Sequence, residues 1–109
     1  MKRDKIVELV QALEDEVNNG GFHQFFYNDA GDNALETIKA LETIGAIKTA
    51  DVLRRAAAMF PGGIPPKERF SRQDVLLDSL SVQVFHALDD EFYAYQENLA
   101  SLLANYQPD

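Results

Sequence analysis

The chain contains no cysteine among its 109 residues. A disulfide framework and a cysteine-ligated zinc site are therefore excluded, and the composition fits a reducing cytosol. No apolar run approaches the ~20 residues that a membrane-spanning helix needs. The basic start Met1–Arg3 is followed at once by Asp4 and soon by Glu8, which argues against a signal peptide. We expect a cytoplasmic protein in which residues 1–109 form a single domain.

Basic residues are scarce as well, with 10 Lys and Arg against 18 Asp and Glu and a net charge of −8. Residues 4–36 hold eight acids and one base, and residues 73–109 hold seven acids and no base. The bases gather in residues 54–72, which hold five of them and one acid. Such a chain should repel nucleic acid and anionic lipid. We therefore expect no direct binding to nucleic acid or membrane.

Apolar residues recur at helical spacing nearly everywhere, and no segment alternates with period two for long enough to predict a sheet. A first helix is expected over about residues 4–18, ended by Gly20 and Gly21, because glycine readily adopts the left-handed conformation of a helix end. Side chains that commonly cap helices predict later starts at Asp32 or Asn33 and at Thr49, Ser71 and Asp89. The predicted fold class is all-α, a compact single-domain bundle of five or six helices.

Each later helix carries apolar residues that should face the core. In chain order these are Leu35, Ile38, Leu41 and Ile44; Leu53, Ala56, Ala57 and Phe60; Leu77, Leu80, Val84 and Leu88; and Phe92, Tyr95, Leu99, Leu102, Leu103 and Tyr106. The last two sets predict two long helices that meet near Asp89. The Pro- and Gly-rich residues 61–66 cannot continue a helix and should form a connection.

The residues that could carry catalysis do not form a recognisable set. His86 has Asp89 and Asp90 three and four residues further on, but one histidine beside a carboxylate is too few ligands for a metal site. The glycine pairs lack the phosphate-loop pattern, and residues 29–33 lack the ligand order of a calcium loop. The sequence predicts no catalytic residue, no metal and no cofactor, and hence a protein that is not an enzyme.

The most distinctive run is aromatic and rich in amides, from Phe22 to Asn28. In one interpretation its rings fill the core beneath a tight helix-to-helix corner, and Asn19, Gln24 and Asn28 bind the backbone groups that the corner leaves unpaired. In the other, the run forms a pocket or a partner-binding patch. We favour the first interpretation.

The same run, Glu16-Val17-x-Asn19-Gly20-Gly21-Phe22-x-Gln24-Phe25-Phe26-x-Asn28, closely resembles the signature of the DNA-mimic protein family, a bacterial family that largely coincides with a domain of unknown function. The likeness continues through Ile44-Gly45-Ala46, Phe60-Pro61-Gly62-Gly63, Pro66-Lys67-x-Arg69, Leu88-Asp89-x-x-Phe92-Tyr93 and Leu102-Leu103-x-x-Tyr106. The resemblance implies an all-helical protein that imitates the charge of duplex DNA and occupies a basic, DNA-binding protein such as a transcriptional regulator. The shared residues themselves resemble a fold signature.

The base-free segment 73–109 is the expected partner-binding face, with the carboxylates of Asp74, Asp78, Asp90, Glu91 and Glu97. Duplex DNA as long as a domain of this size carries ~20 phosphates, so a monomer could imitate one face of it and a homodimer could imitate more. Two alternatives stay open. One is an immunity-type antidote to a basic toxin, and the other is a small-ligand binder that uses residues 22–28.

Overall fold

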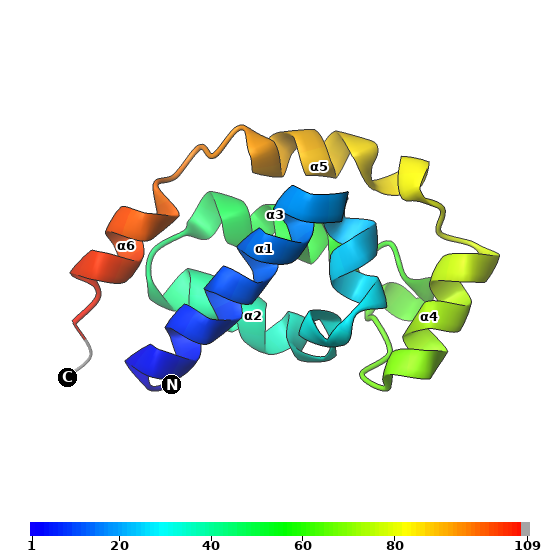
Figure 1. Cartoon of the computed structure of the whole chain (residues 1–109), viewed down its shortest axis with the longest axis horizontal. Coiled ribbons are helices and arrows are strands. Elements are labelled where there is room, and N and C mark those ends of the chain that lie inside the picture. Colours follow the sequence, from blue (N-terminus) through cyan, green and yellow to red (C-terminus); the bar gives the residue numbers. More distant parts are fainter. Residues whose placement is uncertain (108–109) are drawn as a thin grey trace.

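The computed structural model describes residues 1–107. This part of the chain forms six α-helices and three short 3₁₀ segments and contains no strand, which confirms the predicted all-α class (Figure 1). The elements in chain order are α1 (Arg3–Tyr27), η1 (Asp29–Asn33), α2 (Ala34–Thr43), α3 (Ile47–Ala57), η2 (Pro61–Gly63), α4 (Arg69–Asp78), η3 (Val82–Phe85), α5 (His86–Tyr93) and α6 (Leu99–Asn105).

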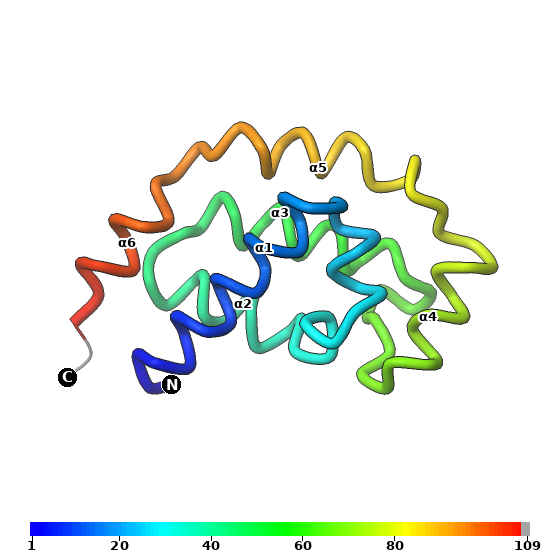
Figure 2. The backbone as a smooth tube through the Cα atoms, viewed as in Figure 1, coloured from blue at the N-terminus to red at the C-terminus, as the bar shows by residue number. Residues whose placement is uncertain are grey.

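Helix α1 bends sharply at its glycine pair. Gly20 has φ −155° and ψ 20°, and Gly21 has φ 75° and ψ −175°, so regular helix geometry is interrupted at both residues. The trace in Figure 2 turns at this point and then descends through a second, shorter helical half. The predicted stop is therefore present, but helical structure resumes at Phe22 without a loop. We call this bend the glycine corner.

The first half of α1 lies at the centre of the molecule. Its apolar stripe of Ile6, Leu9, Val10, Leu13 and Val17 is buried as predicted, and α2, α4 and α5 all contact α1. Figure 1 shows α4, α5 and α6 as an outer arc around α1, α2 and α3. The resulting body has a radius of gyration of 13.2 Å and measures 43 × 27 × 22 Å.

Several helix starts differ from the prediction. Helix α3 begins at Ile47 instead of after Thr49, and α4 begins at Arg69, where the Glu68 carboxylate accepts hydrogen bonds from the amides of Phe70 and Ser71. Asp89 lies in the first turn of α5 and does not cap it. These starts are set by carboxylates and turns that local cap preferences did not identify.

The two long helices predicted near the C-terminus are each broken. The first is interrupted between α4 and η3, and the second is interrupted between α5 and α6, where Tyr95 has φ 44°. The stripe predicted for the first of them is half correct, because Leu80 and Leu88 are buried. Leu77 and Val84 are exposed, and Leu76 is buried in place of Leu77. Leu35 of α2 was also expected inside and is 52% exposed.

Arg72 on α4 is fully buried, which the sequence did not predict. Its guanidinium forms an ion pair of 2.7 Å with Asp32 and donates hydrogen bonds to the carbonyl oxygens of Phe26, Asn28, Pro66 and Lys67. These partners belong to the end of α1, the segment after it and the link before α4. Arg72 thus joins three parts of the chain that meet beside the aromatic run.

Candidate functional site

The aromatic run lies beneath the glycine corner as part of the core. Phe22, Phe25 and Phe26 are completely buried, in agreement with the favoured interpretation. Phe26 packs against Phe60 with ring centroids 4.9 Å apart, and Phe22 packs edge-on against Phe92 at 5.8 Å. Because these contacts join α1 to distant elements, the run positions the helices around the corner.

The amide side chains of the corner do not bind backbone groups, which corrects the expectation for them. Glu16 accepts hydrogen bonds of 3.1 Å from Gln24 Nε2 and 2.8 Å from Asn28 Nδ2, and Asn19 Nδ2 donates to Gln24 Oε1 at 3.2 Å. Glu16 lies on the first half of α1, Gln24 lies on the second half, and Asn28 follows the end of the helix. Their network therefore spans the bend and fixes its angle.

Asp89 of α5 supplies the polar contact that the backbone of the corner needs. The bend leaves the amide of Phe22 without an intrahelical acceptor, and this N–H donates to Asp89 Oδ1 at 2.8 Å. The other oxygen, Oδ2, accepts no hydrogen bond from residues 1–107. A Cβ added to Gly21 would lie 2.6 Å from this Oδ2, so the close approach of the two chains requires glycine.

The Asp89 carboxylate is held in an unfavourable environment. It is 6% exposed, and burial raises the pKa of its carboxyl group, although the Phe22 N–H acts in the opposite direction. Burial likewise lowers the pKa of His23, against the attraction of the Asp89 charge. No lysine or arginine within residues 1–107 forms an ion pair with Asp89.

A shallow hollow opens at the glycine corner in front of this carboxylate. It is lined by Gly20, Gly21, Val82, His86, Asp89, Asp90 and Tyr93. The Tyr93 hydroxyl donates a 2.8 Å hydrogen bond to the Val17 carbonyl oxygen, which fixes the position of its ring. Sequence reasoning assigned Asp89 to a helix cap and gave Tyr93 no role, although both fall within the Leu88-Asp89-x-x-Phe92-Tyr93 pattern.

Two of the five carboxylates expected on the partner-binding face are engaged within the molecule. Glu91 forms a two-bond ion pair with Arg55, at 2.6 and 2.9 Å, and the hydrogen bond from Arg55 lowers the pKa of its carboxyl group. Glu97 accepts 2.9 Å hydrogen bonds from the amides of Lys48 and Thr49. Although burial opposes its charge, these donors lower the pKa of Glu97, which caps α3.

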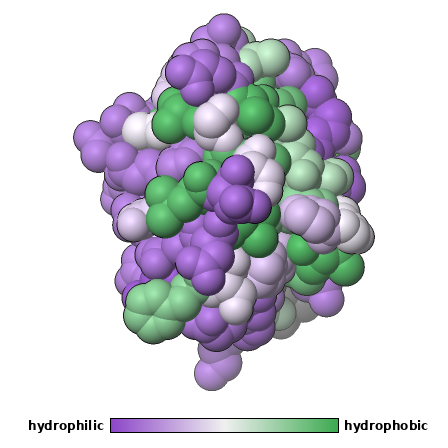
Figure 3. Space-filling model, turned by 90° about the vertical axis from the view of Figure 1, so that its right-hand side faces the viewer, coloured by the Kyte–Doolittle hydropathy of each residue, from purple (hydrophilic) through white to green (hydrophobic). Residues whose placement is uncertain are grey.

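Asp74 and Asp78 lie exposed on α4, one turn apart, with no Lys or Arg paired to them within residues 1–107. Their neighbours Phe70 and Leu77 are 73% and 70% exposed. Figure 3 looks onto this end of the molecule, where hydrophobic and hydrophilic side chains alternate over the surface. This part of the expected face is therefore mixed in character.

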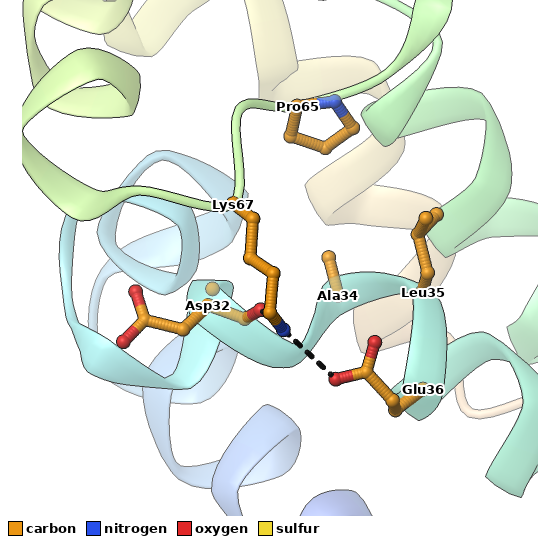
Figure 4. Close-up of a pocket in the computed structure, with 7 residues that line it drawn as sticks. Asp32, Ala34, Leu35, Glu36, Pro65 and Lys67 are labelled. Carbon is orange, nitrogen blue, oxygen red and sulfur yellow. Dashed lines mark hydrogen bonds and ion pairs between the residues drawn. The ribbon is translucent and has the colours of Figure 1, made fainter.

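The basic segment 54–72 is neutralised inside the fold. All five of its bases, Arg54, Arg55, Lys67, Arg69 and Arg72, form ion pairs with Asp32, Glu36, Glu42, Asp51 and Glu91. Figure 4 shows one of these pairs, in which Lys67 reaches Glu36 at 3.4 Å beside Asp32. Because these bases are engaged in ion pairs, their positive charges do not offset acidic side chains elsewhere in the molecule.

Carboxylates without such cations gather around the glycine corner. Asp15 and Glu16 share an open surface patch with Asn18 and Asn19, while Asp89 and Asp90 line the hollow next to Gly20 and Gly21. The Tyr95 hydroxyl contacts Glu14 at 2.9 Å and Asn18 at 2.9 Å, which ties the chain after α5 to the same stretch of α1. We call Glu14, Asp15, Glu16, Asp89 and Asp90 the acidic corner.

Within residues 1–107, no three His, Asp or Glu side chains lie close enough together to hold a metal ion. No helix in the same range is both long and apolar enough to cross a bilayer.

Comparison with known proteins gives one result. The family model for DMP19-like proteins matches residues 2–108, so that it includes the corner motif, Arg72 and all the carboxylates discussed above. No curated protein and no solved structure matches. The chain therefore belongs to the DMP19-like protein family.

Proposed function

We propose that this protein is an acidic interaction module that occupies the DNA-binding surface of a basic protein, such as a transcriptional regulator, as a mimic of DNA. Membership of the DMP19-like family supports this function. The family match covers residues 2–108, which include the motifs that resemble the signature of DNA-mimic proteins. The proposed role is one of binding, without a catalytic step.

The separation of charge in the fold carries the proposal. Every base of residues 54–72 is paired with a carboxylate, whereas the acidic corner contains no carboxylate in an ion pair within residues 1–107. A basic surface that approaches the corner therefore meets uncompensated negative charge. Such complementarity accelerates association and favours basic partners over others.

The dimensions limit how much DNA one molecule can imitate. Duplex DNA carries one phosphate charge per ~1.7 Å, hence ~25 charges over a length equal to the 43 Å long axis. The whole chain has only 18 acidic residues, and five of them are neutralised by the bases of 54–72. We propose that a monomer presents one face of a short duplex, and that a homodimer would extend this face.

The proposal is tested by capturing binding partners from an extract of the cells that produce this protein. The capture is repeated with two variants that remove the same number of charges. The Asp15→Asn/Asp90→Asn variant removes two charges of the acidic corner. The control, Glu36→Gln/Glu42→Gln, removes two charges that are already paired with Lys67 and Arg54. We expect a basic, DNA-binding partner to be captured at low salt, to be released at high salt and to be lost only with the corner variant.

Competition with DNA then separates mimicry from other acidic interactions. DNA that carries the partner's own site should displace the protein. If the partner binds DNA and this protein simultaneously, the mimic function is wrong. If the corner and control variants bind alike, the acidic corner is not the contact surface.

A further inference from the structure

The hollow at the glycine corner contains a carboxylate whose charge the fold does not balance. Asp89 is only 6% exposed, yet of its two carboxylate oxygens only Oδ1 has a hydrogen-bond donor, the Phe22 amide. Its Oδ2 accepts nothing from residues 1–107. The Phe22 amide would be satisfied equally well by a neutral acceptor, so the negative charge is not needed for the bend.

The surroundings of Asp89 favour a cation in the hollow. The exposed carboxylate of Asp90 lies at the rim, and the first half of α1 ends here, so its carbonyl end adds partial negative charge. Gly20 and Gly21 line the hollow without side chains, and the backbone at Gly21 packs directly against Asp89 Oδ2. The burial that raises the pKa of Asp89 would be offset by a bound cation.

We propose that this hollow binds the guanidinium group of an arginine side chain from the protein's basic partner. The inference rests on the proposed function and assigns a specific contact to it. Arginine fits better than lysine for two reasons. Its several N–H donors can reach Asp89 and Asp90 together, and its flat group can lie against an aromatic ring such as that of Tyr93.

Tyr93 is suited to form the wall of such a site. Its hydroxyl is anchored on the Val17 carbonyl oxygen, so the ring is held in place before any partner arrives. Val82 provides a second apolar wall. The charged and ionisable neighbours of Asp89 are His23, His86 and Asp90, and no lysine or arginine of residues 1–107 forms an ion pair with it.

The test uses the whole 109-residue chain, labelled with ¹⁵N, and small probes in place of the partner. Nα-acetyl-arginine amide is titrated while the backbone amide signals are recorded, with Nα-acetyl-citrulline amide as the neutral probe of the same shape. We expect the arginine probe to shift the signals of Gly20, Gly21 and Tyr93, and the citrulline probe to leave them in place.

Two matched variants locate the binding site. Asp89→Asn keeps an oxygen for the Phe22 amide and removes only the charge, and we expect it to weaken binding of the arginine probe by at least ~10-fold. Asp74→Asn removes one charge from α4 and should leave that binding unchanged. If the arginine probe does not shift the corner signals, or if both variants weaken binding equally, the assignment of the hollow is overturned.

Two further outcomes separate this inference from the proposed function. Spermidine that binds the hollow more tightly than the arginine probe would assign the hollow to a free polyamine and overturn its assignment to a protein side chain. A hollow that binds no probe, together with partner capture that still depends on the acidic corner, would reject only the arginine contact.

Discussion

At residue 21 two separate requirements call for glycine. The backbone has φ 75° and ψ −175°, a region that residues with a side chain adopt only under strain. In addition, a Cβ at this position would lie 2.6 Å from Asp89 Oδ2. Gly62 provides a comparison, because it has φ 78° but nothing within 4 Å of an added Cβ.

We predict that Gly21→Ala costs about 3 kcal/mol of unfolding free energy or more, since backbone strain and steric overlap add together. Gly62→Ala should cost only about 1–2 kcal/mol, because strain acts there alone. Urea denaturation of both variants measures the difference. Equal losses would show that the contact between Gly21 and Asp89 is not tight in solution.

The charge on Asp89 should make folding less favourable at neutral pH. Burial raises the pKa of this carboxyl group above its value in the unfolded chain, so the folded state binds the proton more tightly. The resulting stabilisation is present at low pH and is lost as pH rises through the folded-state pKa. A site that costs stability in this way is typical of a functional residue.

We predict that Asp89→Asn gains stability relative to the wild-type protein as pH rises from 3 to 7. Other carboxylates with shifted pKa values, such as Glu97, contribute equally to both proteins and cancel in the difference. Urea unfolding at pH steps measures it. A variant that becomes less stable than wild type with rising pH would mean that the Asp89 charge stabilises the fold.

At the scale of the elements, Arg72 is the side chain on which the packing of α4 depends. It forms an ion pair with Asp32 and donates to four carbonyl oxygens while fully buried. Arg69 also pairs with Asp32, at 2.8 Å, but its side chain is 44% exposed. The two arginines therefore share a partner and differ in burial.

We predict that Arg72→Met costs about 3–5 kcal/mol, because it leaves Asp32 and four carbonyl oxygens at the end of α1 and before α4 without their buried donor. Arg69→Met should cost far less, since exposed ion pairs contribute little to stability. Thermal unfolding of the two variants provides the comparison. If both variants unfold near the wild-type temperature, α4 is held mainly by its apolar contacts.

The accuracy of the sequence predictions depended on how local each signal was. Helical periodicity, the stop at Gly20 and Gly21 and the proline-rich connection were found because they depend on neighbouring residues. The start of α3 was missed because its capping carboxylate, Glu97, is 48 residues away from Thr49. Arg72 was missed for the same reason, since a charged side chain is buried only where distant acceptors meet it.

For the candidate site too, predictions from local signals succeeded and those that depended on distant residues failed. Burial of Phe22, Phe25 and Phe26 followed from their helical spacing. Charge counting along the chain could not tell which carboxylates are free, and it grouped Glu91 and Glu97 with Asp90 although both have partners within the fold. Only the folded chain brings Asp89 against the corner, because 67 residues separate it from Phe22.

On the scale of the whole molecule, the net charge of −8 is distributed so that attraction and repulsion lie in different places. Ion pairs connect the segment 54–72 to η1, α2, α3 and α5, while the acidic corner carries like charges close together. Screening by salt weakens both effects, since the Debye length falls from ~30 Å at 0.01 M to ~10 Å at 0.1 M. The exposed pairs contribute little, so repulsion should dominate the response.

We predict that raising NaCl from 0.01 to 0.2 M stabilises the protein against urea while it weakens binding to the basic partner. The two measurements must move in opposite directions, because screening relieves repulsion within the molecule and removes attraction between the molecules. The Asp15→Asn/Asp90→Asn variant should respond less to salt in both experiments, and Glu36→Gln/Glu42→Gln should keep the full response in binding. If salt weakens binding and folding together, loss of the partner would follow from unfolding, and the acidic corner would not be the source of the affinity.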